Sequence, residues 1–119
     1  MTIRCVIVDD SERFRTSARR LLTAEGITVV ATAADSCQAI RAVEQEHPDV
    51  VLVDVGLGAE SGFDLAARIQ RSPVIMVSSL APEDLAELLA GSPAIGYLPK
   101  DQLSGTAISY LLDGASRPC

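Results

Sequence analysis

Polar side chains that could do chemistry follow four apolar segments of the sequence. Asp9 and Asp10 come directly after IRCVIV, and Asp54 follows VVLV. Ser78 follows VIMV, and Lys100 follows GYLP. Clustered carboxylate oxygens without His or Cys favour a hard cation such as Mg²⁺. A cation, a lysine and a hydroxyl around one carboxylate are what phosphoryl transfer requires, so the sequence predicts this chemistry if the segments bring the side chains together.

Each of these residues also has a purely structural interpretation. Asp9 and Asp10 could end a strand and cap the next helix, Asp54 could be a turn acid, and Ser78 could end a strand. Their combination favours a site, because three acids brought together repel one another unless a cation neutralises them. Lys100 supports the same interpretation, since it is the only lysine beside nine arginines and a lysine ammonium is a compact point charge.

Five short apolar runs predict the strands that would position these side chains. They are IRCVIV (3–8), ITVVATA (27–33), VVLV (50–53), VIMV (74–77) and AIGYL (94–98). Their apolarity is continuous rather than alternating, and β-branched residues dominate. This pattern is typical of strands that are covered on both faces, as in parallel sheets.

Amphipathic segments of helical length separate and follow the five runs. They cover about residues 11–26, 36–46, 62–71, 82–91 and 104–112. Ser11 is placed to cap the first helix, and Gly26 to end it. The second helix should end before His47, because the residue before Pro48 resists helical geometry. Pro82 suits the first position of the fourth helix.

The alternation of strands and helices predicts an α/β fold with right-handed crossovers, as one domain over residues 1–119. The most apolar strands, the first, third and fourth, should be central, and the glycine-bearing fifth should lie at an edge. This distribution predicts a doubly wound five-stranded parallel sheet of order 2-1-3-4-5. Ligands of such sheets bind at the carboxyl ends of the strands, where the order reverses between strands one and three. Asp54 lies closest to that point and is the expected nucleophile.

The motifs VIVDD, VLVDVGL, VIMVSS and GYLPKD, in this order, resemble those of CheY-like receiver domains of two-component response regulators. The resemblance covers essentially the whole chain and implies the flavodoxin-like fold of that family. It further implies that Asp54 is the phosphoacceptor. Asp10 would be a direct Mg²⁺ ligand and Asp9 would act largely through water. The main-chain carbonyl of Gly56 would supply another ligand.

The resemblance also implies a switch. Ser78 would hydrogen-bond one phosphoryl oxygen, and Lys100 would pair with another. Tyr97 occupies the position of the switch aromatic, although it could also be a simple edge-strand residue. The surface that changes would comprise the fourth helix, fifth strand and fifth helix, about residues 82–112.

The implied partners are a histidine kinase or phosphotransfer protein as donor, and a downstream protein or fused output domain as target. A homodimer is a further expected partner arrangement. The protein would be a signalling switch rather than an enzyme, catalysing only its own phosphorylation and dephosphorylation. It is expected to be either a stand-alone regulator or the receiver part of a longer transcription factor.

Four features depart from the family pattern. Gly58 replaces a common proline, and Ser61 replaces the acid that usually precedes Gly62, so we expect a more mobile loop. Asp101 follows Lys100 where proline is common, an ending similar to receivers of LuxR-type regulators. Ser78 comes only 24 positions after Asp54, which predicts a shortened third helix.

Charge and composition limit the partners and the location. The net charge is −6, and the basic residues are scattered. Four arginines of the first helix are predicted to form a solvated face: Arg13, Arg15, Arg19 and Arg20. We therefore expect no direct nucleic-acid binding. No run is long enough to cross a membrane, and no signal peptide is apparent. Cys5, Cys37 and Cys119 suggest neither a disulfide framework nor a zinc site, so a cytoplasmic location is expected.

Three alternatives remain open. A haloacid-dehalogenase-like phosphatase would also combine Asp, Ser and Lys on an α/β sheet. A resemblance to that class would require a D-x-D motif at the nucleophile, whereas residue 56, two positions after Asp54, is glycine. Nucleotide or flavin binding is suggested by Gly56, Gly58 and Gly62, but the spacing does not fit the dinucleotide fingerprint. The third alternative is a degenerate receiver that acts as a phosphorylation-independent interaction module.

Overall fold

The computed structural model describes residues 2–116, so Cys119 lies outside the described residues. The main elements are β1 (Arg4–Val8), α1 (Glu12–Ala24), β2 (Thr28–Ala33), α2 (Ser36–Glu46), β3 (Val50–Asp54), β4 (Gly56–Leu57), β5 (Glu60–Ser61), α3 (Gly62–Arg68), β6 (Val74–Ser78), α4 (Ala86–Ala90), β7 (Gly96–Pro99) and α5 (Gly105–Ser116). Two 3-10 turns, η1 (Pro82–Leu85) and η2 (Lys100–Gln102), precede α4 and α5. The prediction of one domain over residues 1–119 extends beyond this part of the chain and stays a prediction.

The main sheet has five strands in the order β2-β1-β3-β6-β7, and each neighbouring pair is parallel. The predicted order 2-1-3-4-5 is therefore confirmed, with β6 and β7 as the fourth and fifth strands. β3 and β6 are buried along their whole length, whereas the edge strand β7 is half-buried. The two short strands β4 and β5 form a separate antiparallel hairpin.

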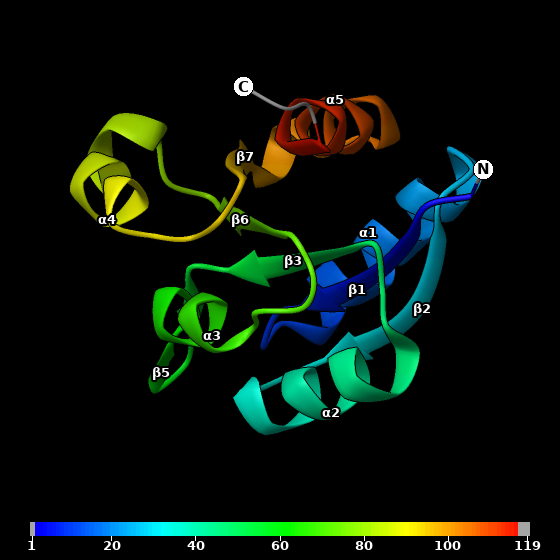
Figure 1. Ribbon diagram of the computed structural model, residues 1–119, viewed down its shortest axis with the longest axis horizontal. Helices are drawn as coiled ribbons and strands as arrows, with labels where there is room; N and C mark the ends of the chain where they lie inside the picture. The colour runs from blue at the N-terminus through cyan, green and yellow to red at the C-terminus, as the bar shows by residue number, and fades with distance from the viewer. Residues whose placement is uncertain (1, 117–119) are drawn as a thin grey trace.

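The sheet separates two hydrophobic clusters, with helices on both sides (Figure 1). Val51 and Val53 of β3 join the cluster that contains residues of α2 and α3. Val50 and Leu52 of the same strand join the cluster that contains residues of α1 and α5. Successive side chains of a strand point to opposite faces. Continuous apolarity in the strands is thus explained by helices on each face.

The ends of the first two helices follow from their local sequence. Ser11 caps α1, since its Oγ accepts a hydrogen bond from Phe14 N at 3.2 Å. Gly26 follows α1 with φ +88°, a backbone conformation that glycine adopts readily. His47 ends α2 in a left-handed conformation, directly before Pro48. These boundaries agree with the sequence predictions.

Three helices differ from the predicted ranges. α3 ends at Arg68 rather than residue 71, because Ile69 leaves the helical conformation and is buried in the core. The segment predicted as the fourth helix begins with the 3-10 turn η1, and only Ala86–Ala90 is α-helical. α5 continues to Ser116, beyond the predicted end at residue 112. Across residues 2–116, each helix is too short or too polar to span a bilayer.

Candidate acidic site at the carboxyl edge of the sheet

Three carboxylates converge at the carboxyl ends of β1 and β3. These strands are adjacent, and Val8 is in register with Val53, so the residues that follow them come to the same level of the sheet. One carboxylate oxygen from each of Asp9, Asp10 and Asp54 lies within 4.8 Å of the others. Asp9 is fully buried and Asp54 is 8% exposed, whereas Asp10 is exposed. The sequence prediction that strand order would assemble these acids is confirmed.

Lys100 supplies a positive charge to this cluster from the other end of the chain. It begins the 3-10 turn after β7. Its Nζ lies 2.7 Å from Asp9 Oδ2 and 3.4 Å from Asp54 Oδ2. β6 separates β7 from β3 in the sheet, so the lysine must reach across the end of β6. One ammonium therefore pairs with two of the three carboxylates.

The surroundings of Asp54 change its acidity. Burial raises the pKa of its carboxyl to about 6, and the neighbouring charge of Asp9 acts in the same direction. The charge of Lys100 and a hydrogen bond from Gly56 N oppose this rise. Burial alone would lower the pKa of Lys100, but its hydrogen bond and charge interactions with both acids raise it above the ordinary lysine value. Lys100 is therefore positively charged at neutral pH.

The donor set suits a hard divalent cation. The cluster offers only carboxylate oxygens, which are the ligands that Mg²⁺ prefers. Asp9 Oδ2 is buried and, apart from its ion pair with Lys100, accepts no hydrogen bond from residues 2–116. A buried carboxylate oxygen with spare acceptor capacity next to two other acids is a chemically reasonable metal ligand. Gly56 N donates to Asp54 Oδ1 at 3.4 Å, while the role of the Gly56 carbonyl stays a prediction.

The segment after Asp54 forms the β4–β5 hairpin, which the sequence analysis did not predict. Gly58 has φ +64° in its turn, and a Cβ added there would lie 3.4 Å from Asp10 Oδ2. A proline at this position is incompatible with the observed turn, because its ring fixes φ near −65°. The replacement of the family's proline by Gly58 thus has a structural reason. The expected greater mobility of this loop stays a prediction.

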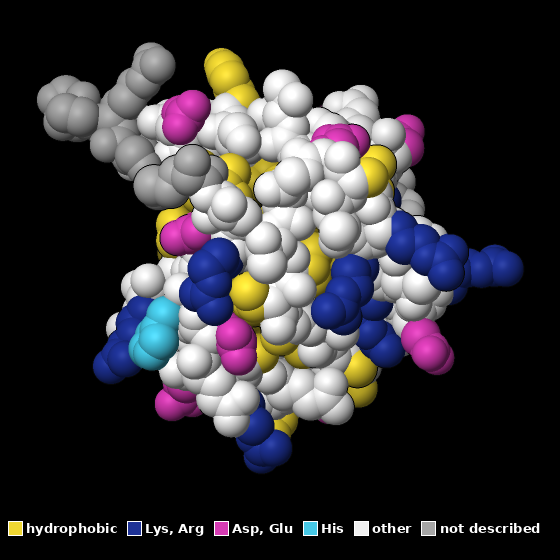
Figure 2. Space-filling view, turned by 90° about the vertical axis from the view of Figure 1, so that its right-hand side faces the viewer, with side chains coloured by type: hydrophobic (Ala, Val, Ile, Leu, Met, Phe, Trp, Pro, Cys, Tyr) yellow, Lys and Arg dark blue, Asp and Glu magenta, His cyan; other side chains and the backbone are white. Residues whose placement is uncertain are grey.

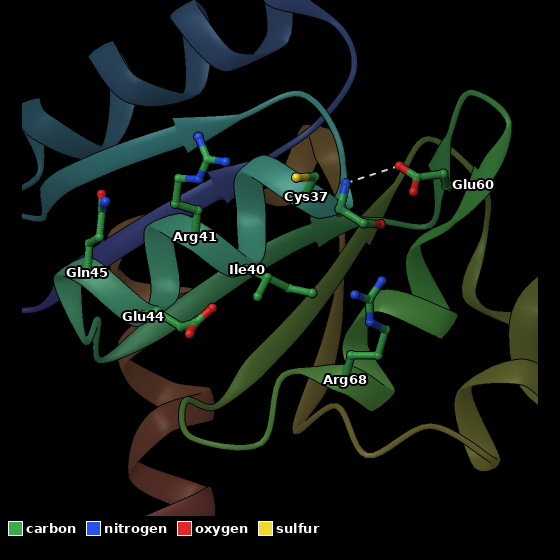
Figure 3. Close-up of a pocket in the computed structure, with 8 residues that line it drawn as sticks. Cys37, Ile40, Arg41, Glu44, Gln45, Glu60 and Arg68 are labelled. Atoms are coloured by element: carbon green, nitrogen blue, oxygen red, sulfur yellow. Dashed lines mark hydrogen bonds between the residues drawn. The ribbon is translucent and has the colours of Figure 1, made fainter.

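The hairpin is anchored to α2 by Glu60. Its Oε1 accepts a hydrogen bond from Ser36 N at 3.0 Å, drawn as the dashed line in Figure 3. Beside this contact lies a pocket of about 530 Å³ whose lining includes Cys37, Ile40 and Arg68. The predicted site residues do not line this pocket. The acidic site is therefore a separate feature at the edge of the sheet.

Ser78 and Tyr97 meet through the segment after β6. Asp54 is in register with Val77, so Ser78 lies one residue beyond the partner of Asp54. Ser78 is buried, and its Oγ accepts a hydrogen bond from Leu80 N at 3.1 Å. The Tyr97 hydroxyl donates to the carbonyl of Leu80 and lies 3.4 Å from that of Ser78. Tyr97 thus contacts the Ser78 segment directly, and its role as a switch stays a prediction.

Two contacts from α1 were missed in the sequence analysis. The ring centroid of Phe14 lies 4.3 Å from Lys100 Nζ, although Phe14 was interpreted only as part of an apolar helix face. Arg15 Nη1 donates to the main-chain carbonyl of Asp9 at 2.6 Å. Arg15 is accordingly half-buried, whereas the other three arginines of the predicted solvated face are exposed. The signal available in the sequence was the position of both residues in the first turn of the helix that follows Asp9 and Asp10.

A doubly wound parallel sheet with acids and a lysine at the switch point defines a CheY-like α/β domain. Residues 5–109 match the model of the response regulator receiver domain. The chain belongs to this family, a signalling module of two-component systems. The expected fold and family are confirmed, and this membership leaves no support for the phosphatase and dinucleotide-binding alternatives.

Similar proteins support the same family. The NarL signal receiver domain of Mycobacterium tuberculosis has a TM-score of 0.80 and 28% identity, covering 98% of each chain. A LuxR-family response regulator from Aurantimonas has a TM-score of 0.84 and 28% identity, covering 96% of this chain and 87% of that one. A protein-glutamate methylesterase/protein-glutamine glutaminase of Halobacterium salinarum is 38% identical over an alignment of 114 residues, which covers 93% of this chain and 33% of that protein. The chain thus spans about a third of the length of this curated relative.

Proposed function

We propose that this receiver domain accepts a phosphoryl group on Asp54 from a histidine kinase or phosphotransfer protein. The observation that carries this proposal is the position of Lys100 Nζ, which lies between the buried carboxylates of Asp9 and Asp54. An ammonium held there can stabilise negative charge on a phosphoryl group that bonds to Asp54. Asp54 is the suitable nucleophile, because it lies at the end of β3 at the switch point.

The transfer is an in-line substitution at phosphorus. An Asp54 carboxylate oxygen attacks the phosphorus of a phosphohistidine and forms the oxygen–phosphorus bond of an acyl phosphate. The nitrogen–phosphorus bond breaks, and its electron pair stays on the imidazole nitrogen of the donor. Lys100 would pair with one phosphoryl oxygen, and the Ser78 hydroxyl would donate to another after leaving its contact with Leu80 N.

Mg²⁺ is the proposed cofactor. Asp10, Asp54 and the Gly56 carbonyl would hold it directly, with Asp9 acting largely through water. When bound, the ion would reduce the repulsion between the attacking carboxylate and the phosphoryl oxygens. The support for this assignment is the all-oxygen cluster and the spare acceptor capacity of Asp9 Oδ2.

Phosphorylation would alter the surface formed by α4, β7 and α5. The link is the contact of the Tyr97 hydroxyl with the backbone of Ser78 and Leu80. On this surface Leu88 of α4 is 56% exposed and Tyr110 of α5 is 77% exposed, which suits binding of a partner. That partner would be a downstream protein, a fused output domain or a second copy of the chain.

The surface and the cysteines support the remaining expectations. On the face shown in Figure 2, several basic side chains gather on the right-hand side, with acidic and uncharged side chains around them. The net charge of −6 supports a protein partner rather than direct contact with nucleic acid. Cys5 and Cys37 are both free thiols, which supports a location in the reducing cytoplasm. The proposed protein is a signalling switch that catalyses only its own phosphorylation and dephosphorylation.

The test is incubation with Mg²⁺ and acetyl phosphate, followed by intact mass measurement and two-dimensional NMR. We expect the mass of one labile phosphoryl group and amide shifts that extend to Tyr97. The adduct should be lost in Asp54→Asn and kept in Asp64→Asn, a control at an exposed carboxylate of α3. If neither adduct nor shift develops at saturating reagent, the degenerate receiver is the better description.

A further inference from the structure

The ammonium of Lys100 has a third neighbour besides the two carboxylates. The face of the Phe14 ring lies below it, with Nζ 4.3 Å from the ring centroid. A cation within about 6 Å of an aromatic centroid is attracted by the negative charge of the ring face. The lysine is therefore held from two directions, by acids at the sheet edge and by a ring from α1.

The start of α1 fixes the place of this ring. Ser11 Oγ accepts the hydrogen bond from Phe14 N, so the first helical turn begins directly after the acidic pair. Phe14 is half-buried and packs against the core cluster that includes Ala18 and Leu22. The ring therefore contacts both the core and the Lys100 ammonium.

The two carboxylates do not hold Lys100 equally. Its Nζ is closer to Asp9, at 2.7 Å, than to Asp54, at 3.4 Å. Asp9 is also a proposed participant in metal binding, and a cation near its carboxylate would compete with the ammonium and repel it. The Phe14 ring is the neighbour that this competition leaves in place.

We propose that Phe14 is a positioning residue that keeps the Lys100 ammonium beside Asp54 when the acidic site is loaded. This inference rests on the proposed function, because it assigns Phe14 a role in phosphorylation of Asp54. The ring does not touch the reacting atoms and acts only through Lys100. Phe14 is therefore expected to affect the rate of phosphoryl transfer more than the affinity of the site for Mg²⁺.

The first test compares two substitutions of Phe14. Phe14→Leu keeps an apolar side chain against the core but removes the aromatic face. We expect it to slow phosphorylation by acetyl phosphate roughly three- to tenfold, the range that a moderately desolvated cation–π contact predicts. Phe14→Tyr keeps the ring face and should remain within about twofold of the wild-type rate. Equal rates for Phe14→Leu and wild type would overturn the proposal.

A double-mutant cycle separates positioning from a general structural effect. In a Lys100→Ala background, Phe14→Leu should change the residual phosphorylation rate by less than about twofold, because the group on which the ring acts is gone. The same fold loss in both backgrounds would show that Phe14 acts independently of Lys100 and would overturn the proposal.

NMR of Lys100 tests the contact without any reaction. Because the chain has one lysine, selective lysine labelling gives a single set of side-chain signals. Methylene protons next to the ammonium should be shifted upfield by the ring in wild type, with and without Mg²⁺. The shift should persist in Phe14→Tyr and disappear in Phe14→Leu. Loss of the upfield shift on addition of Mg²⁺ would overturn the proposal, even if Phe14→Leu slows phosphorylation.

A different result would show that the proposed function itself is wrong. Wild type that takes up no phosphoryl group under any of these conditions would refute phosphorylation of Asp54 and, with it, a role for Phe14 in that step. Normal phosphorylation of wild type with no effect of Phe14→Leu would refute only the role of Phe14.

Discussion

The backbone of Gly62 lies directly against the backbone of Asp54. A Cβ added at Gly62 would be 1.9 Å from the Asp54 carbonyl oxygen, and Gly62 N donates to the Val55 carbonyl at 2.8 Å. The start of α3 is therefore joined to the end of β3 immediately beside the proposed phosphoacceptor. This close approach requires a residue without a side chain.

Gly62→Ala should destabilise the protein, because neither the strand backbone nor the start of α3 can move aside cheaply. Overpacking of this kind costs about 1–3 kcal/mol of unfolding free energy, and more where backbone is displaced. Urea unfolding followed by circular dichroism measures the change. Gly114→Ala is the matched control, since a Cβ there would meet nothing within 4 Å. Equal destabilisation by both substitutions would contradict the steric explanation.

The raised pKa of Asp54 predicts a pH dependence of stability in the absence of divalent cations. Its carboxyl has a pKa of about 6 in the folded protein and 3.8 as the ordinary value. The folded state therefore holds the Asp54 proton more tightly than the unfolded state does. The unfolding free energy should fall by at most about 2–3 kcal/mol as the pH rises from about 4 to about 6. Asp54→Asn should lack this fall. Urea unfolding of wild type and Asp54→Asn in EDTA at a series of pH values measures this fall. Parallel plots of unfolding free energy against pH for the two proteins would contradict the prediction.

Mg²⁺ should stabilise the folded protein through the acidic cluster. At a concentration ten times the dissociation constant, a ligand that binds only the folded state adds about 1.4 kcal/mol to the unfolding free energy. Asp10→Asn should remove most of this increment, because Asp10 is a proposed direct ligand. Thermal unfolding with a Mg²⁺ titration measures it, and Asp64→Asn should respond as wild type does. Undiminished stabilisation of Asp10→Asn would exclude Asp10 as a principal ligand.

Glu60→Ala should release the hairpin from α2. The substitution removes the acceptor for Ser36 N, and loss of such a hydrogen bond costs roughly 0.5–1.5 kcal/mol, or more for a charged acceptor. Amide hydrogen exchange at Ser36 should become faster. Glu87→Ala on the exposed side of α4 is the control and should leave this amide unchanged. An unaltered exchange rate in Glu60→Ala would show that the hairpin is held by other contacts.

Much of the sheet and the acidic site could be predicted from the sequence. Segments such as VVLV at 50–53 are continuously apolar because they pack against helices on both faces. Once strand order is known, the residues that follow adjacent parallel strands must meet at one edge. The convergence of Asp9, Asp54 and Lys100 therefore follows from the strands that precede them.

The features that the sequence did not predict, or predicted with other bounds, depend on a few residues or on contacts between distant residues. The β4–β5 hairpin has two residues in each strand, too few for a periodic pattern. The end of α3 is set by burial of Ile69, which no local stop signal marks. The helix propensity of residues 62–71 alone would continue α3 beyond Arg68.

The sequence by itself determined the order of the strands and the identity of the chemical groups at their ends, because hydrophobic pattern and strand polarity are local properties. Only the tertiary structure decided which of those groups contact one another and at what distance. The Phe14 ring meets Lys100 because the first turn of α1 and the turn after β7 come together at the sheet edge. That distance depends on the packing of the whole domain, since the two residues are far apart in the chain.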